Sequence, residues 1–478
     1  MSPKGAIPPS QQAVAGEPAP SEPRRGLWVL CEGSQRVLED PLKIETLIQD
    51  AERLGATDLF VQVYRGGRAW YAAELADAAP HRTILATTGT DTLQLLIERA
   101  HEADLRVHAW VNVLSLSKNG NAPILRALGR DAVLVDRKGR SLLDYPSYEI
   151  PQPDREWYRM GTPGLYLDAA APGVRERLVA TFEELLTGYP ALDGLHLDYI
   201  RHPGVLPLIP GSRFGVGLDF GYGEGSRARF ELETQLRAPT GDSMVNLTRW
   251  DSWRRDQVTE LVSAIAAKTN KLKPELELSA AVIAYADRAY LTLAQDWLRW
   301  LEDDDLDFAV PMIYTLDNRL LRYQAERFAT SPLNERLWAG LGTWLFAKRP
   351  SRAVEQLEIA KTAGMRHHAL FSYDSMADTA EDGTRPLIEA FATAPAKATT
   401  SKPAPDTTPP KPDTPKESKV PNRKPAQPDG GAAPSPESPP GPTIEPVPEA
   451  RDAARPSTPK TNPAAEPEGA PASAGDGG

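Results

Sequence analysis

Short runs of β-branched and aromatic residues recur along the chain, and each is followed by a longer stretch with apolar residues at helical spacing. Eight such runs predict β-strands, at residues 26–32, 58–64, 106–113, 192–200, 276–284, 306–315, 336–344 and 367–373. The helical stretches that follow them lie, in the same order, at 41–54, 91–103, 173–187, 250–271, 291–301, 320–328, 352–363 and 385–391.

This alternation of strands and helices predicts a parallel sheet in an α/β fold. Eight units over residues 25–391 fit a closed (β/α)8 TIM barrel with enlarged loops. The alternative is an open, doubly wound sheet, which usually carries a glycine-rich phosphate loop after its first strand. The residues after the first run here, 31–41, lack that glycine spacing, so we favour the barrel.

Two connections between a strand and its helix are far longer than the usual two to six residues. They cover 114–172, after the third strand, and 201–249, after the fourth. Both belong to the C-terminal face of the barrel, where enzymes of this fold build their active sites. The second connection is rich in glycine, and the first carries Tyr145, Tyr148, Trp157, Tyr158 and Tyr166. Long loops on this face predict an extended cleft for a large substrate.

The two ends of the chain differ in composition from the middle. Residues 392–478 contain no Phe, Trp or Tyr and hold nearly half of the 46 prolines. Such a segment cannot bury enough apolar surface to offset its chain entropy. We therefore expect one folded domain, 25–391, between a disordered N-terminal segment, 1–24, and a disordered Pro/Ala-rich tail, 392–478.

Charge and composition argue against several classes of partner and site. The net charge of -11 argues against nucleic acid, which requires a concentrated basic face. No apolar run is long enough to span a membrane, and the first residues lack the apolar core of a signal peptide. The single cysteine, Cys31, excludes an intrachain disulfide and a cysteine-based metal site. These observations leave the oligomeric state and the compartment open.

The most informative string is Asp193-Gly-Leu-His-Leu-Asp198-Tyr-Ile-Arg-His-Pro203, on the predicted fourth strand. Alternation puts His196 and Asp198 on one face, and Asp198 falls at the C-terminal end, where a carboxylate reaches the cleft. Asp193, at the opposite end, is interpreted as structural. Other predicted strand-end or inward polar residues that we expect at this rim are Glu32, Gln62, Tyr64, His108, Trp110, Asn112, Tyr199, Arg201, Tyr285, Tyr314, Trp344 and Asp374.

Several strings resemble one known family when they are taken in order. They are Arg25-Gly-Leu-Trp, Gln62-Val-Tyr, His108-Ala-Trp-Val-Asn112, the Asp193–Pro203 string, Trp253-Arg-Arg-Asp256 and Pro311-Met-Ile-Tyr314. Together they resemble the glycosyl-hydrolase-like family 10 barrels over about 25–391. The resemblance implies hydrolysis of β-linked glycans, with the peptidoglycan glycan strand as one substrate, and a place in the bacterial cell envelope; without it, the cytoplasm would be expected.

Hydrolysis of a glycosidic bond needs a proton donor and a second group that stabilises or traps the oxocarbenium-like centre. Asp198 is the candidate for one role, and Glu32 or Asp374 for the other. A third option is assistance by an N-acetyl group of the substrate, which needs only an orienting carboxylate. We expect the other rim residues to bind a polysaccharide, with no cofactor and no metal.

Two rival functions remain open. A metal-dependent hydrolase would use His108, His196 and Asp198 as zinc ligands on neighbouring strands. A non-catalytic barrel would bind glycan without turnover, and loss of the second carboxylate would favour it. We also expect Arg254 or Arg255 to brace the loop that carries Asp198.

Overall fold

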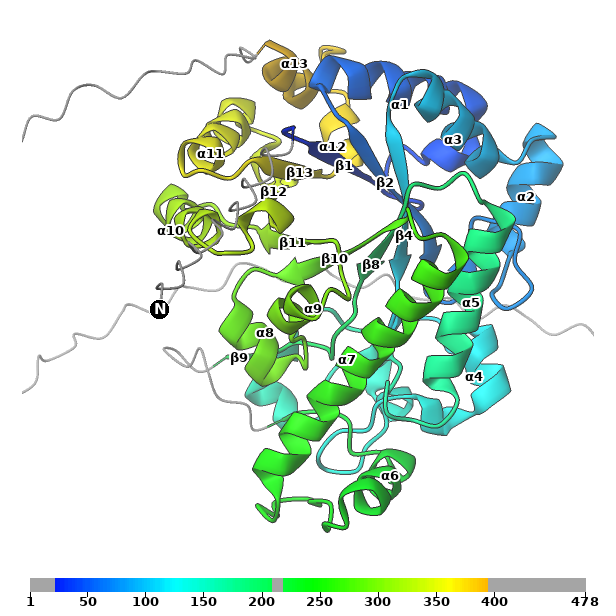
Figure 1. The fold of residues 1–478 in the computed structure, drawn as a ribbon, viewed down its shortest axis with the longest axis vertical. Helices are drawn as coiled ribbons and strands as arrows, with labels where there is room; N and C mark the ends of the chain where they lie inside the picture. Colours follow the sequence, from blue (N-terminus) through cyan, green and yellow to red (C-terminus); the bar gives the residue numbers. More distant parts are fainter. Residues whose placement is uncertain (1–21, 209–217, 394–478) are drawn as a thin grey trace, which may run out of the picture. The chain divides into compact units, whose positions relative to one another are not determined.

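The computed structural model describes residues 22–208 and 218–393. Within them, eight parallel strands form a closed barrel, because each strand pairs with the next around the ring and the first pairs with both the second and the last. This confirms the predicted TIM barrel (Figure 1). The strands are β1 (Arg25–Val29), β2 (Asp58–Arg65), β4 (Arg106–Asn112), β8 (Gly194–Asp198), β10 (Glu277–Ile283), β11 (Phe308–Ile313), β12 (Trp338–Gly342) and β13 (His367–Phe371).

Helices follow the barrel strands along the chain, and local sequence signals set their ends. The side chain of Asp40 accepts a hydrogen bond from Leu42 N at the start of the first helix, and Gly55, with φ of 61°, ends it. Between the barrel strands lie α1 (Pro41–Leu54), α2 (Ala79–Thr88), α3 (Thr92–Glu102), α5 (Val174–Gly188), α7 (Leu247–Leu272), α8 (Ala286–Thr292), α9 (Trp297–Glu302), α10 (Asn318–Ala329) and α11 (Pro350–Thr362), and after the last strand α12 (Tyr373–Ala377) and α13 (Pro386–Thr393).

The predicted helix at 291–301 is wrong, because the chain forms α8 and α9 there instead. Ala294 lies between them with φ of 52°. The break turns Gln295 inward, where its side-chain oxygen accepts a hydrogen bond from Ile283 N at 2.9 Å. A tertiary contact with the end of β10 therefore overrides the helical pattern.

The interior of the barrel is packed with aromatic side chains. Trp28, Phe60, Trp110, Phe308 and Trp338 are all nearly inaccessible to solvent, and they form one cluster with small residues from the other strands. A separate and larger cluster fills the space between the strands and the helices. The barrel is thus a solid core, and a ligand can enter only at one of its ends.

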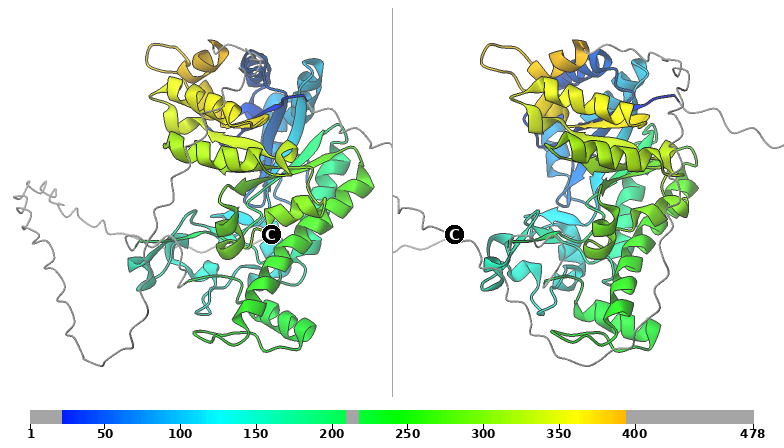
Figure 2. Two further views of the ribbon diagram at one scale, coloured as in Figure 1. Left: turned by 60° about the vertical axis from the view of Figure 1, so that its left-hand side comes forward. Right: turned by 90° about the vertical axis from the view of Figure 1, so that its left-hand side faces the viewer.

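The two long connections pack against each other in the lower part of Figure 1, and both views of Figure 2 keep them together. The antiparallel pairing of β6 (Tyr158–Met160) with β9 (Val205–Pro207) joins the two connections, and β5 (Ser115–Ser117) pairs with β7 (Leu165–Tyr166) within the first one. They also contain α4 (Pro123–Leu128) and α6 (Glu224–Thr234). Trp250 and Trp253 of α7 pack against Phe230 of α6, so the first turns of α7 support this region.

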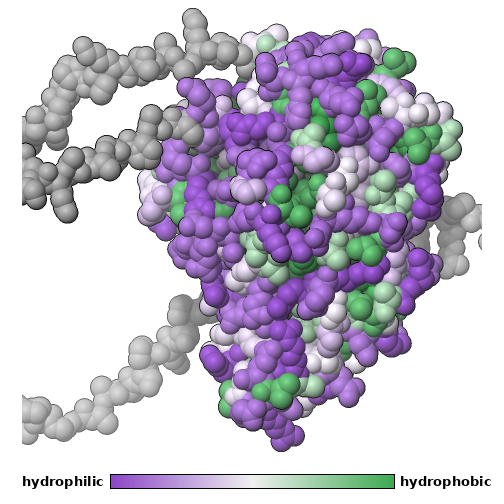
Figure 3. Space-filling view, turned by 45° about the vertical axis from the view of Figure 1, so that its right-hand side comes forward, coloured by the Kyte–Doolittle hydropathy of each residue, from purple (hydrophilic) through white to green (hydrophobic). Residues whose placement is uncertain are grey.

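The surface gives no indication of a membrane span. On the face drawn in Figure 3, hydrophobic residues form small patches separated by polar ones. None of the helices in the described part of the chain has the length and apolar character to cross a membrane. The expected disordered segments fall almost entirely on residues 1–21 and 394–478, outside the described residues.

Candidate active site

A cavity of about 770 Å³ lies at the C-terminal ends of the barrel strands, bounded by the long connections. Side chains of β2, β4, β8 and the residues following β10 and β11 line it. Of the residues predicted for the site, the cavity brings together Gln62, Trp110, Asn112, Asp198, Tyr199, Arg201, Tyr285 and Tyr314.

Asp198 is the last residue of β8 and is only 6% exposed. Its Oδ1 accepts hydrogen bonds from Tyr199 N at 2.6 Å and from the Arg201 guanidinium at 3.4 Å. Its Oδ2 accepts one from Trp110 Nε1 at 3.2 Å. Burial raises the pKa of Asp198, and these donors oppose the shift only in part. The carboxyl group therefore holds a proton at higher pH than an exposed aspartate does.

The neighbours of Asp198 are held in fixed positions. Gln62 Nε2 donates to Asn112 Oδ1 at 3.2 Å, and Cys31 Sγ contacts Gln62 Oε1 at 3.1 Å. The Arg201 guanidinium lies over the Tyr199 ring, 4.5 Å from its centre. These contacts restrain the polar side chains around Asp198, which is what a catalytic wall requires.

Two of the expected carboxylates lie away from this cavity. β1 ends at Val29, so Glu32 lies in the loop beyond it, paired with Arg65 at 3.2 Å and Arg68 at 2.7 Å. Asp374 lies in α12 rather than at a strand end, and accepts hydrogen bonds from Leu30 N at 2.9 Å and Gln35 N at 3.1 Å. Asp374 therefore holds the loop after β1, and neither carboxylate faces Asp198.

A bulge in β2 corrects the prediction for Tyr64. In the pairing with β4, Gln62 lies opposite Trp110 but Tyr64 lies opposite Val111, so one extra residue, Val63, interrupts the alternation. Tyr64 consequently faces the helix layer and packs edge-on against Phe182 of α5. Simple alternation predicts that Gln62 and Tyr64 share one face of the strand, and the bulge places them on different faces.

The two predicted histidines lie deeper in the barrel than Asp198. Trp28 Nε1 donates to His196 Nε2 at 3.1 Å, and His196 Nδ1 lies 2.8 Å from Ser279 Oγ. Burial lowers the pKa of His196 well below its usual value, so the ring is a neutral part of the core. His108 lies deeper still, and its ring packs directly against Gly194. A Cβ on that glycine would lie only 2.0 Å from His108 Nδ1.

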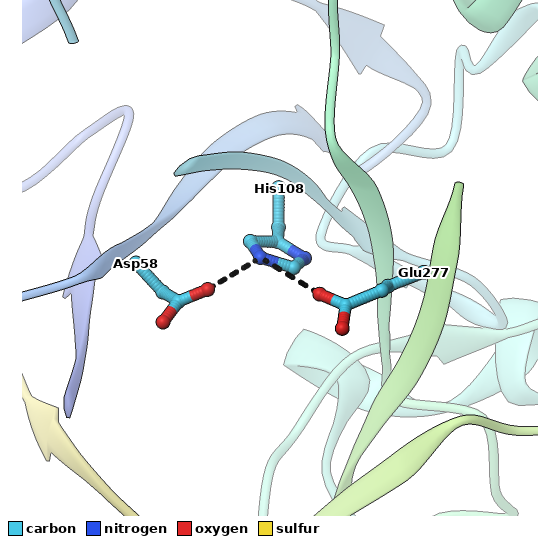
Figure 4. A group of neighbouring side chains, drawn as sticks. All are labelled: Asp58, His108 and Glu277. Atoms are coloured by element: carbon cyan, nitrogen blue, oxygen red, sulfur yellow. Dashed lines mark hydrogen bonds and ion pairs between the residues drawn. The ribbon is translucent and has the colours of Figure 1, made fainter. Parts of the chain in front are cut away.

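The metal ligands proposed from the sequence do not converge. β4 and β8 pair with His108 opposite Gly194, so Asp198 lies four residues, or about 13 Å, further along the barrel. The group of metal-ligating side chains in the described residues is instead Asp58, His108 and Glu277 (Figure 4). The Arg24 guanidinium already pairs with both of these carboxylates.

The last expected residue, Trp344, does not line the cavity. It lies in a 3-10 turn after β12 and is 48% exposed. Of the five aromatic residues singled out in the first long connection, Tyr166 lines the cavity. Five further residues line the cavity that were not predicted from the sequence, namely Arg65, Thr162, Arg288, Met312 and Phe371. Arg65 carried a usable signal, because it is the last residue of β2.

One brace predicted from the sequence is present. Arg254 Nη2 donates to Asp219 Oδ2 at 2.9 Å, and Arg254 Nη1 donates to the carbonyl oxygen of Phe220. Both partners belong to the connection that follows Asp198. Arg255 donates instead to the carbonyl oxygen of Tyr290 at 2.9 Å, in the helix after β10.

Comparison with known proteins gives a consistent family. The chain is 22% identical over 325 residues to glycosyl hydrolase DigH of Escherichia coli K12, a match that spans 62% of this chain and 66% of DigH. It is 24% identical over 285 residues to glycosyl hydrolase YngK of Bacillus subtilis, covering 56% of this chain and 48% of YngK. The matches thus span less than two thirds of the length of these relatives.

Among solved structures, a β-galactosidase from Rahnella sp. R3 superposes with a TM-score of 0.50 at 14% identity, over 78% of this chain and 56% of that one. At this identity the likeness supports the barrel fold alone. The model of the Glycosyl hydrolase-like 10 family matches residues 23–332, which include Asp198 and most of the cavity. The chain belongs to the Glycosyl hydrolase-like 10 family.

Proposed function

We propose that this protein is a glycoside hydrolase that cleaves a β-linked polysaccharide and that Asp198 is its central catalytic residue. The observation that carries the proposal is the position of Asp198, a buried carboxyl group with a raised pKa on the wall of the large cavity at the C-terminal end of the barrel. A carboxyl group whose pKa is raised by burial holds its proton more tightly than an exposed aspartate, which suits the donation of a proton to a leaving sugar oxygen.

The residues that line the site suit a carbohydrate substrate. The cavity is bounded by residues of both long connections, among them Thr162, Tyr166 and Leu206. Tyr199, Tyr285 and Tyr314 offer ring faces and hydroxyl groups, which suit the C–H faces and hydroxyls of sugars. We propose the peptidoglycan glycan strand as the substrate, on the basis of the family.

The test is the release of new reducing ends from purified, peptide-free peptidoglycan strands, with chitin oligomers as a second substrate. The wild-type protein should release reducing ends, and the Asp198→Asn variant should release far fewer. Absence of release from both substrates, with a folded protein that binds the strands in a co-sedimentation assay, would contradict hydrolysis.

That last outcome would support the second candidate, a non-catalytic glycan-binding barrel. One observation favours it: among the described residues that line the cavity, Asp198 is the only acidic side chain. Glycoside hydrolases of the common retaining and inverting types use a pair of carboxyl groups. The binding barrel would retain strands without generating reducing ends.

A further inference from the structure

The hydroxyl group of Tyr314 stands out among the polar atoms of the cavity. Tyr314 follows β11 and lines the cavity with Asp198. Its hydroxyl oxygen is buried and has no hydrogen-bond partner among the described residues. A buried polar group without a partner is unfavourable, so this hydroxyl is suited to a ligand that supplies the missing partner.

The Tyr314 ring is fixed, so the hydroxyl points to a defined place. The ring packs against Phe371, with the ring centres 5.6 Å apart. A Cβ on Gly342 would lie 3.1 Å from Tyr314 Cδ1, so the glycine makes room for the ring on another side. Asp198 lies close enough to raise the pKa of Tyr314, although burial is the larger cause. The phenol therefore stays protonated and can donate a hydrogen bond.

We infer that Tyr314 and Asp198 form a subsite for a sugar with a 2-acetamido group, in which the Tyr314 hydroxyl donates a hydrogen bond to the acetamido carbonyl oxygen. A carbonyl oxygen accepts but cannot donate, which matches a protonated phenol. Phe371 and Met312 line the same cavity, and they offer apolar surface to the acetamido methyl group. The inference rests on the proposed hydrolysis and assigns a residue to the recognition of the acetamido group of its substrate.

The subsite also supplies the second group that the reaction lacks. The acetamido oxygen bonds to the anomeric carbon while the bond to the leaving oxygen breaks, and that oxygen takes its electron pair and the Asp198 proton. The products are a cyclic oxazolinium ion and the Asp198 carboxylate. Water then adds to the anomeric carbon, the acetamido oxygen leaves, and Asp198 takes a proton from the water. The anomeric configuration is retained.

Tyr314 positions the carbonyl oxygen for this attack. The oxygen has two lone pairs, so one can accept from Tyr314 while the other reaches the anomeric carbon. Asp198 is then the one carboxyl group that the reaction requires. This assignment explains why Glu32 and Asp374 can both point elsewhere in a chain that still hydrolyses glycans.

The first test measures binding of the thiazoline of N-acetylglucosamine, a stable analogue of the cyclic ion, by calorimetry. The wild-type protein should bind it, and Tyr314→Phe should bind it about 10- to 100-fold more weakly. The matched control is Tyr323→Phe, because Tyr323 lies on α10 and is 62% exposed. Equal affinity of the wild type and Tyr314→Phe, or no binding by a folded wild type, would overturn the inference.

The second test compares peptide-free peptidoglycan strands with the same strands after chemical removal of the acetyl groups. Cleavage of the acetylated strands alone, with retention and with a lower kcat in Tyr314→Phe, supports the subsite. Similar cleavage of both strands overturns the subsite but leaves the hydrolase standing. Cleavage of neither overturns the hydrolase, and thiazoline binding then decides on the subsite by itself.

Discussion

At the scale of single residues, the two carboxyl oxygens of Asp198 accept hydrogen bonds from different donors. A backbone N–H and a guanidinium lie at Oδ1, and an indole N–H lies at Oδ2. Of the four lone-pair sites of a carboxylate, at least one remains available to a substrate. Tyr199, which follows Asp198, has a left-handed backbone with φ of 51°, a conformation that is uncommon for residues other than glycine.

The first prediction concerns turnover. Asp198→Asn preserves the shape of the side chain but removes the transferable proton. We expect the rate of reducing-end release to fall by roughly 10²–10⁴-fold. Near-normal turnover on a glycan that the wild type cleaves would show that Asp198 is not the catalytic residue.

The second prediction concerns the pH dependence of stability. Because the pKa of Asp198 is raised on folding, the native state keeps a proton that the unfolded chain releases at a pKa of about 3.9. The stabilisation that this proton gives the native state is fully present below the pKa of Asp198 in the unfolded chain. It is lost as the pH rises through the pKa of Asp198 in the native state. Asp198→Asn cannot ionise, so its free energy of unfolding relative to the wild type should increase as the pH is raised from acidic to neutral.

Urea unfolding at several pH values measures this difference. The substitution Asp131→Asn, at an exposed position, is the matched control and should show no such trend. A difference between Asp198→Asn and the wild type that stays constant with pH would mean that Asp198 titrates normally in the folded protein.

The third prediction concerns Glu32, which contacts the cavity only through Arg65. Glu32→Gln should reduce turnover by no more than about five-fold, because a partly exposed salt bridge contributes about 0.2–1 kcal/mol. Steady-state kinetics on the substrate used for Asp198→Asn measures the change. A loss as large as that of Asp198→Asn would instead make Glu32 and Asp198 a working catalytic pair.

At the scale of elements, the guanidinium of Arg254, whose side chain is 11% exposed, braces the connection after β8. Besides its bonds to Asp219 and Phe220, the Arg254 guanidinium pairs with Asp251 in its own helix and lies 5.0 Å from the centre of the Tyr222 ring. It thereby ties the start of α7 to Asp219 and Phe220 in the connection after β8. The same helix carries Trp250 and Trp253, which pack on α6.

The fourth prediction tests this brace. Arg254→Met keeps much of the side-chain volume but removes the donor to the Phe220 carbonyl oxygen and the cation paired with Asp219, which keeps only the hydrogen bond from the Tyr222 hydroxyl among the described side chains. We expect the free energy of unfolding to fall by about 2–4 kcal/mol. Arg319→Met on α10, where the side chain is 94% exposed, is the control and should change stability by less than about 0.5 kcal/mol. Equal stability of the two variants would show that Arg254 is not a brace.

At the scale of the whole molecule, the barrel has two different ends. The C-terminal end holds the cavity, whereas Arg24 closes the other end by pairing with Asp58 and Glu277 and lying 4.7 Å from the centre of the Trp338 ring. Burial opposes ionisation of Asp58, yet hydrogen bonds from His108 and Arg24 hold the pKa of Asp58 below its usual value. This charged cluster therefore belongs to the stability of the barrel, and the chemistry belongs to the opposite end.

The fifth prediction concerns the limits of the folded unit. A chain of residues 22–393 should keep its melting temperature within about 2 °C, because it retains every described contact. A chain that ends at Thr384 loses α13, whose Leu387, Ile388 and Phe391 are buried, and should be destabilised by several kcal/mol, at about 1.5–3 kcal/mol per side chain. Calorimetry of both chains measures the change. A large loss in the first chain would place part of the folded unit outside 22–393.

Much of the barrel could be predicted because each unit carries its own periodic signal. The hydrophobic runs place all eight strands, and the caps at Asp40 and Gly55 are local. The break at Ala294 could not be predicted, since it accompanies a hydrogen bond that Gln295 accepts from Ile283 N, on a strand that is near only in the folded chain. In the candidate site, Asp198, Asn112 and Tyr314 could likewise be predicted from a local signal, their place at strand ends.

By itself the sequence determined the strand order, the closed barrel and the end of it that carries Asp198, because periodicity and the chirality of βα units need no knowledge of distant contacts. Only the tertiary structure decided how deep each side chain lies in the barrel and in which direction it points. The bulge at Val63 turned Tyr64 outward, the register of β4 with β8 buried His108 about four residues below Asp198, and pairing with Arg65 and Arg68 drew Glu32 away from the cavity. Each of these outcomes depends on how neighbouring strands and loops align, which no local pattern encodes.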